Sequence, residues 1–194
     1  MLPRLLRFAL LCPALLLNAA YATASDYVLD TEGMHASIQF RIRHLGYSWL
    51  NGRFNDFDGA FRYHPDYLED ATIKVTINTA SVDSNHAERD KQLRGKDFLH
   101  VAEHPQARFV STRIQKISED HFYVIGNLTL RGVSREIQIE TQKVGEGPDP
   151  DGGYRVGFSG LTRLVLRDFG ITRFLGNAAT TVDLLLDIEG IRQD

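Results

Sequence analysis

The sequence predicts an all-β protein, built from about eight long antiparallel strands with a single helical segment. Runs of alternating apolar and polar residues recur along most of the chain. Turn-forming residues separate these runs at hairpin spacing, and only residues 85–99 have the character of a helix. Alternation with a period of two buries one face of each strand and leaves the other in water, which is typical of antiparallel sheets.

Residues 1–24 are predicted to be a cleaved signal peptide and are left out of the fold. Arg4 and Arg7 form a positive n-region, Phe8–Leu17 is an apolar h-region, and Ala22–Ala24 has the small-x-small pattern of a cleavage site. The apolar run is shorter than the roughly 20 residues that a membrane-spanning helix needs. We therefore expect an exported protein that does not span a membrane.

The predicted mature chain is mildly acidic and contains no cysteine. Loss of the signal leaves 20 Lys and Arg against 25 Asp and Glu, and it removes Cys12, the only cysteine. This balance argues against a nucleic-acid partner and against adhesion to anionic lipid surfaces, because both need a basic footprint. A thiol-free exported chain fits the bacterial periplasm, and residues 25–194 are long enough for one domain held together by its core.

The first half of the mature chain contains four predicted strands. These are the short strand Tyr27–Leu29 and three longer strands that alternate between apolar and polar residues, Met34–Leu45, Arg53–Tyr63 and Ala71–Val82. Phe54 is out of phase with the rest of its strand, which indicates a bulge or a bend just after it.

Between the second and third of these strands lies an apolar connection, Leu45–Gly52. It holds two glycines, two leucines, Tyr47 and Trp49. Loops are usually polar, so we expect this one to pack on an apolar partner, either on the barrel itself or on a second copy in a homodimer.

The densest charge cluster, Asn85–Leu99, predicts the helix. Asp83, Ser84 or Asn85 is suited to cap its first turn, and Gly95 is suited to end it. Phe98 and Leu99 then fold back as an apolar plug. We expect this segment to cover the sheet, with its acids and bases paired to each other or to water.

Five further strands with intervening turns fill the second half of the chain. The predicted ranges are 108–117, 122–130, 136–144, 154–166 and 182–188. A sheet of this size either stacks on another or closes, and closure removes its edge strands. Small residues on the inward rows, such as Ala36, Gly126 and Gly160, suit both a tapered packed barrel and one with room for a ligand.

The chain also carries motifs that resemble the YceI family, bacterial periplasmic proteins that bind polyisoprenoids. The resemblance extends over Asp26–Ile191. It rests on the order and spacing of His44–Leu50, Phe57–Gly59, Val75–Asn78, Ser81–Asp83, Asn85–Lys91 and Leu128–Val133.

This resemblance implies an elongated, eight-stranded, lipocalin-like barrel with a helical lid after the fourth long strand. Its interior would hold a long prenyl chain, such as that of a polyprenyl phosphate or a quinone, and brief membrane contact would accompany transfer. A fatty-acid or fatty-amide binder of the same shape is a second reading. A quinone-linked enzyme or electron-transfer partner is a third. The resemblance supplies no catalytic residue and no cofactor, and we expect a protein that is not an enzyme.

We expect the ligand to contact the inward rows and the lid. The predicted lumen residues are Ile38, Phe40, Ile42, Trp49, Phe57, Phe61, Ile73, Val75, Leu93, Phe98, Phe109, Val124, Leu128, Phe158, Leu164, Leu184 and Leu186. A polar head group needs donors at the mouth of the tube. The candidates are Arg41, His44, Arg89 and Arg94, each of which also suits an ordinary solvated surface.

No metal site and no nucleophile are expected. Of the seven histidines, His100 and His104 stand four apart, a spacing that suits two ligands on a helix. Pro105 follows at once, so we expect an irregular stretch there. No Gly-x-Ser-x-Gly motif occurs. Asp56 and Asp58 share the wet face of a strand, where solvation is the simpler account.

Overall fold

The computed structural model describes residues 24–33, 35–150 and 152–193. The predicted signal peptide lies outside these residues except for Ala24. The strands are β1 (Ser25–Leu29), β2 (Ser37–His44), β3 (Ser48–Phe54), β4 (Phe57–Tyr63), β5 (Thr72–Asn78), β6 (Val82–Asp83), β7 (Gln106–Lys116), β8 (His121–Leu130), β9 (Val133–Pro148), β10 (Tyr154–Val165) and β11 (Thr181–Arg192). The helices are α1 (Ala87–Arg94) and three short 3-10 turns, η1 (Leu68–Asp70), η2 (Thr79–Ser81) and η3 (Leu166–Phe169).

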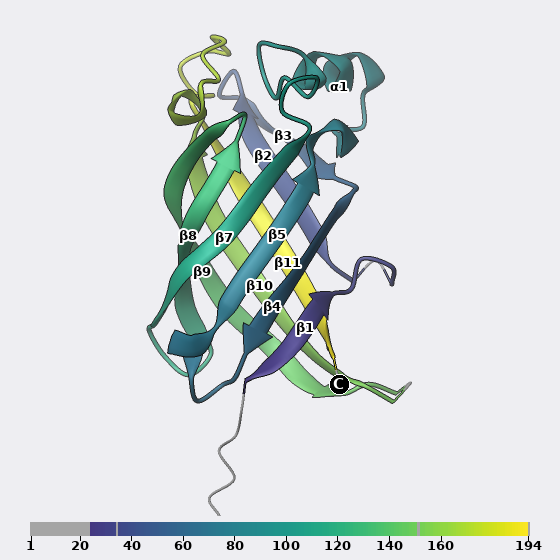
Figure 1. Cartoon of the computed structure of the whole chain (residues 1–194). Helices are drawn as coiled ribbons and strands as arrows, with labels where there is room; N and C mark the ends of the chain where they lie inside the picture. The colour runs from purple at the N-terminus through teal and green to yellow at the C-terminus, as the bar shows by residue number, and fades with distance from the viewer. Residues whose placement is uncertain (1–23, 34, 151, 194) are drawn as a thin grey trace, which may run out of the picture.

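Eight of these strands close into a ring, which confirms the predicted barrel (Figure 1). The order is β1-β4-β5-β7-β8-β9-β10-β11, and β1 pairs back onto β11. All neighbours in the ring are antiparallel. α1, the β2–β3 turn and η3 lie at one end of the barrel, called the helix end here, and the start of β1 and the end of β11 lie at the other, the terminal end.

Along the edge of β11 that faces away from β10, two different strands pair one after the other. Its last residues pair with β1, for example Gly190 with Leu29, whereas its first half pairs with β2, for example Leu184 with Phe40. β3 continues this upper wall from β2, and its end pairs with β6. The wall therefore passes from β1 to β2 between residues 29 and 37, and from β3 to β4 between residues 54 and 57.

The stretch Leu45–Gly52, predicted to be a loop, is mostly a strand. Only Leu45–Tyr47 forms the turn, where Leu45 and Gly46 take left-handed conformations. β3 then runs antiparallel to β2 with Gly52 opposite Phe40, and a Cβ on Gly52 would overlap the Phe40 ring. The glycine that suggested a loop is thus a close-packing position inside a sheet. The predicted Arg53–Tyr63 strand is likewise two strands, broken where Phe54 leaves the phase.

α1 starts one residue later than the predicted caps allow. His86 is the N-cap, and its Nδ1 accepts a hydrogen bond from the Arg89 N–H at 3.3 Å. Asn85 instead takes a left-handed conformation in the preceding turn. Gly95 ends the helix as predicted.

The barrel core is closed at both ends by packed side chains. At the terminal end, Tyr27 stacks on Phe61 with ring centroids 5.0 Å apart, and Phe158 meets Tyr63 edge-on at 5.2 Å. At the helix end, Phe40, Val82 and Leu99 form a separate buried cluster under α1. The space that side chains leave unfilled lies in the core between these two ends.

Candidate functional site

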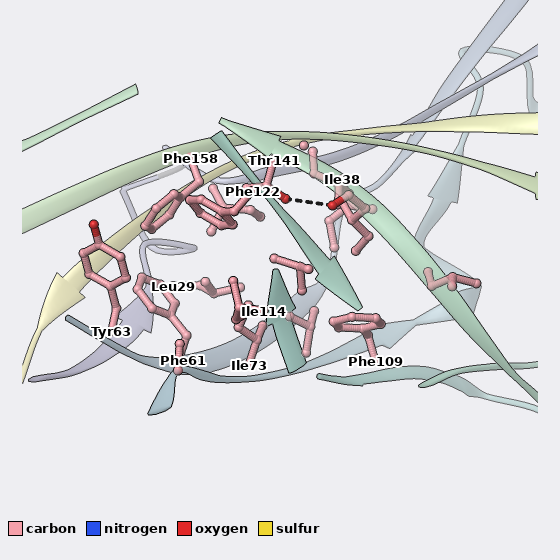
Figure 2. A pocket seen from close by; sticks show the side chains of 18 of the residues that line it. Leu29, Ile38, Phe61, Tyr63, Ile73, Phe109, Ile114, Phe122, Thr141 and Phe158 are labelled. Atoms are coloured by element: carbon pink, nitrogen blue, oxygen red, sulfur yellow. Dashed lines mark hydrogen bonds between the residues drawn. The ribbon is translucent and has the colours of Figure 1, made fainter. Parts of the chain in front are cut away.

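An apolar cavity of about 140 Å³ occupies the barrel interior between the two packed ends (Figure 2). The wall presents no polar surface, because Thr141 turns its hydroxyl to the Ile139 carbonyl at 3.2 Å. The lining residues are Leu29, Ile38, Phe61, Arg62, Tyr63, Leu68, Ala71, Ile73, Val75, Ile77, Phe109, Ile114, Phe122, Val124, Leu128, Ile137, Ile139, Thr141, Phe158, Gly160, Leu184, Leu186 and Ile188.

The alternation of each strand places these side chains inside. Ile73, Val75 and Ile77 of β5 are two residues apart, as are Ile137, Ile139 and Thr141 of β9. Successive residues of a strand point to opposite faces, so each of these rows faces the lumen. A local property of the backbone therefore builds most of the cavity wall.

Ten of the predicted lumen residues lie on this wall. They are Ile38, Phe61, Ile73, Val75, Phe109, Val124, Leu128, Phe158, Leu184 and Leu186. Whether they contact a lipid remains a prediction.

The structure places the other seven predicted lumen residues away from the cavity. Phe40 and Leu93 belong to the cluster at the helix end, and Phe57 and Leu164 pack within the core. Ile42 is half-buried opposite Val182, and Phe98 is half-buried in the turn after α1. Trp49 is 40% exposed.

The sequence prediction did not include the other thirteen lining residues, for three different reasons. Most of them, such as Tyr63, Phe122 and Ile139, stand on inward rows that periodicity identified but that were not chosen as ligand contacts. Ile114 faces inward because the β7–β8 register shifts between Ser111 and Arg113, which the pattern did not reveal. Leu68 comes from η1, a turn without any strand pattern.

At the terminal end, aromatic rings and η1 close the cavity. Leu68 is buried there, and Phe158 packs edge-on against Tyr63 and Phe122. Burial raises the pKa of Tyr63 to about 12. Its phenol is therefore uncharged at neutral pH, which suits a side chain that borders an apolar cavity.

At the helix end, α1 and the turns after it close the barrel. Leu93, Leu99 and Val101 pack on Phe40 and Val82, and we call residues 87–104 the cover. Leu99 is 9% exposed, as expected of the predicted apolar plug.

The cover is tied down by charged side chains of α1. Arg94 donates Nε to the Ala80 carbonyl at 2.8 Å and Nη2 to the Val82 carbonyl at 2.9 Å. Arg89 donates to the Ser84 hydroxyl and carbonyl, and buried Asp90 accepts from the Ser84 N–H at 2.8 Å. Arg89, Asp90 and Arg94 therefore bind the strand connection beside the helix, whereas the sequence predicted that the charges of this segment pair with each other or with water.

The predicted head-group residues are thus largely occupied at the helix end. Arg89 and Arg94 hold backbone carbonyls, and Arg41 donates to Asp183 at 3.1 Å while stacking over Trp49. The Arg163 hydrogen bond lowers the pKa of Asp183 against the effect of burial, and Arg41 lowers it further. His44 is exposed at the β2–β3 turn.

A second hollow, of about 260 Å³, lies where the wall changes strands. It is more polar than the cavity, and Ile38 lines both. The lining residues are Thr31, Glu32, Ala36, Ser37, Ile38, Arg53, Phe54, Asn55, Asp56 and Phe57. This side hollow adjoins the apolar interior at Ile38.

Two side-chain groups of the described chain have the composition of a metal site. Asp30, His35 and Glu189 are one, but Arg155 lies among them and donates to Glu189 at 2.7 Å and to Asp30. A guanidinium therefore already supplies the positive charge at this place. His100, Glu103 and His104 are the other.

A closed eight-stranded antiparallel barrel around an apolar cavity defines the class of small antiparallel barrels with an apolar interior. Among the described residues, no helix has the length and apolar character needed to cross a membrane.

Known proteins place the chain within that class. The YceI-like domain family matches residues 27–190. A UPF0312 protein of Pseudomonas aeruginosa is 54% identical over 185 residues, covering 95% of this chain and 96% of the relative. The chain therefore belongs to the YceI-like family.

Solved structures agree on the fold. A YCEI protein of Campylobacter jejuni has a TM-score of 0.72 and 26% identity, with 79% of this chain and 91% of the other covered. A polyisoprenoid binding domain from Saccharophagus degradans has a TM-score of 0.62 and 15% identity, with 86% and 98% covered. The second of these, at its low identity, bears on the fold alone.

Proposed function

We propose that this protein is a periplasmic, non-enzymatic carrier that holds the chain of a long isoprenoid lipid in its barrel. The observation that carries the proposal is the cavity wall, which is apolar over its whole surface. A prenyl chain is apolar along its length, and burial stabilises it by roughly 25 cal/mol per Å². A protein of the same fold is described as a polyisoprenoid binding domain, and we propose the same ligand class here.

The size of the cavity sets a condition on this binding. An apolar cavity of about 150 Å³ accommodates a molecule the size of benzene. A long chain therefore requires the wall side chains to move apart. Phe158 is only half-buried between Tyr63 and Phe122, and its rotation would lengthen the cavity toward the terminal end.

A carrier role also agrees with the chemistry of the wall. Its side chains offer no carboxylate, imidazole or thiol to the interior in the described chain. Carboxylates, imidazoles and thiols are frequent acid–base and nucleophilic groups in catalysis, and of the two hydroxyl-bearing lining residues, Tyr63 and Thr141, the second already donates its hydroxyl to the Ile139 carbonyl.

We propose the side hollow as the place for the head group. The donors of Arg89 and Arg94 already bind backbone carbonyls, whereas Arg53 lines a polar hollow that meets the cavity at Ile38. A chain inside the barrel would then leave its polar end among Arg53, Asn55 and Thr31.

Mass spectrometry of an organic extract of the purified protein tests the ligand class. A prenyl lipid is the expected result, an acyl species would favour a fatty-acid or fatty-amide binder, and redox turnover of an added quinone would favour the quinone-linked reading.

Ile137→Trp should fill the lumen and abolish lipid recovery. Gln138→Trp, on the outer face of the same strand, is the matched control and should leave recovery unchanged. Equal recovery from both variants would contradict binding in the cavity.

A further inference from the structure

The turn from His100 to His104 is more regular than its sequence suggests. The backbone N–H groups of Glu103 and His104 both donate to the His100 carbonyl, at 3.0 and 2.9 Å. This closes one helical turn before Pro105. Positions i, i+3 and i+4 of such a turn lie on one face, so the two imidazoles and the carboxylate come together.

The distances within this group suit a shared ion. The ligand atoms of the three side chains all lie within 4.8 Å of one another, and His100 Nε2 is 3.6 Å from Glu103 Oε1. The ring centroids of His100 and His104 are 5.7 Å apart. Two imidazoles that share an ion at metal–nitrogen distances of about 2.0–2.1 Å have centroids roughly 5 Å apart. Small side-chain rotations are therefore enough to bind a metal.

The backbone that carries these ligands is already anchored. Thr79 donates its N–H to the Pro105 carbonyl at 3.0 Å and its hydroxyl to the His104 carbonyl at 2.7 Å. The His104 ring lies against Gly132, where a Cβ would come within 2.9 Å of its Cε1. His100 is held in a left-handed conformation by the hydrogen bond from its N–H to the Gly95 carbonyl. The turn does not have to fold around the ion.

We infer that His100, Glu103 and His104 bind one divalent transition-metal ion. Two imidazoles and a carboxylate suit Zn²⁺, Ni²⁺ or Cu²⁺. The expected affinity is highest for Cu²⁺, and both Ni²⁺ and Zn²⁺ should bind more weakly than Cu²⁺. Three protein ligands leave further coordination positions to water. The site lies in the cover but does not depend on the proposed lipid ligand.

Calorimetric titration of the untagged mature protein with ZnCl₂ tests the site. We expect one ion per chain and a higher melting temperature with Zn²⁺ present. Loss of an outer-shell partner already costs about 10–100-fold in metal affinity, and Glu103→Gln or His104→Ala should cost at least as much. Because the Glu103 side chain is 68% exposed, its substitution should leave the fold intact.

His121→Ala is the matched control. His121 Nε2 lies 3.2 Å from Glu140 Oε1, and the described residues place no third metal-ligating side chain beside this pair. The variant therefore removes a histidine from a His–Glu pair outside the proposed site. This variant should bind zinc as the unmodified protein does. The inference would be overturned if Glu103→Gln and His104→Ala bound zinc with unchanged affinity, or if the unmodified protein bound none.

Discussion

Arg94, the last residue of α1, donates its Nη2 to the backbone carbonyl of Val82 at 2.9 Å. Val82 is 1% exposed and belongs to the cluster that closes the helix end of the cavity. The charge that ends the helix is therefore used to fix the cover onto the barrel. This relation leads to the first of four predictions.

Arg94→Ala should loosen the cover and leave the barrel folded. Hydrogen bonds from a charged donor contribute about 1.5–3 kcal/mol each, so we expect hydrogen exchange of the backbone amides of Leu99 and Val101 to be faster by at least about tenfold. Those two amides donate to Leu93 and Arg94 of the helix. Release of a fluorescent prenyl lipid should accelerate in parallel. Arg43→Ala, which removes an exposed arginine stacked on Trp49, is the control, and similar exchange in both variants would contradict this role.

Leu99→Ala should destabilise the cover, whereas Trp49→Ala should have little effect. Deletion of a buried leucine side chain costs about 2–5 kcal/mol, and Leu99 is 9% exposed. Trp49 is 40% exposed, with Arg41 and Arg43 over its ring. Lipid release rates and urea unfolding of the two variants give the comparison. Faster release from Trp49→Ala than from Leu99→Ala would restore Trp49 to the lid in which the sequence placed it.

Asp30 should stabilise the contact between the end of β1 and strands β10 and β11, and this contribution should depend on pH. Burial acts to raise its pKa, but hydrogen bonds from His35, Arg155 and the Gly33 N–H lower the pKa to about 2. A carboxyl whose pKa is lower in the folded state stabilises the fold above its unfolded pKa, and this contribution disappears as the pH falls to the folded pKa. The shift corresponds to about 2 kcal/mol at neutral pH.

Urea unfolding of Asp30→Asn between pH 7 and pH 2 measures this contribution. The difference in unfolding free energy from the unmodified protein should be constant above about pH 5 and shrink between about pH 4 and pH 2. Asp58→Asn, an exposed position on β4, serves as the control. A stability difference for Asp30→Asn that does not change with pH would show that the ionised carboxylate is not the source.

The position of the head group can be tested by a pair of arginine variants. Arg53→Gln should weaken binding of a prenyl phosphate and leave binding of the corresponding prenyl alcohol unchanged, because only the phosphate needs a charged donor. Arg41→Gln should affect neither, since Arg163 still donates to Asp183 at 2.6 Å. The opposite pattern in a fluorescence competition assay would move the head group to the helix end.

Sequence periodicity predicted the barrel strands well and the irregular parts poorly. The alternating row in β5 was identified because polar and apolar residues change places at every step. The prediction assigned residues 48–52 to a connection because glycine and aromatic residues obscured the alternation, and only the fit of Phe40 over Gly52 explains why a glycine stands in that strand. The cap of α1 was displaced by one residue for a similar reason, since the left-handed turn at Asn85 is not visible in composition.

By itself, the sequence determined which side chains face inward, that the strands are antiparallel and that a charged helix interrupts them. These are local properties, because the direction of a side chain follows from the backbone of its own strand. Only the tertiary structure decided which inward rows surround a cavity, where the wall opens into a side hollow and which partners the arginines choose. Arg41 and Asp183 are 142 residues apart in sequence, and contacts of that kind depend on which strands pair. The turn that carries His100, Glu103 and His104 is anchored by Thr79, which also comes from a different part of the chain.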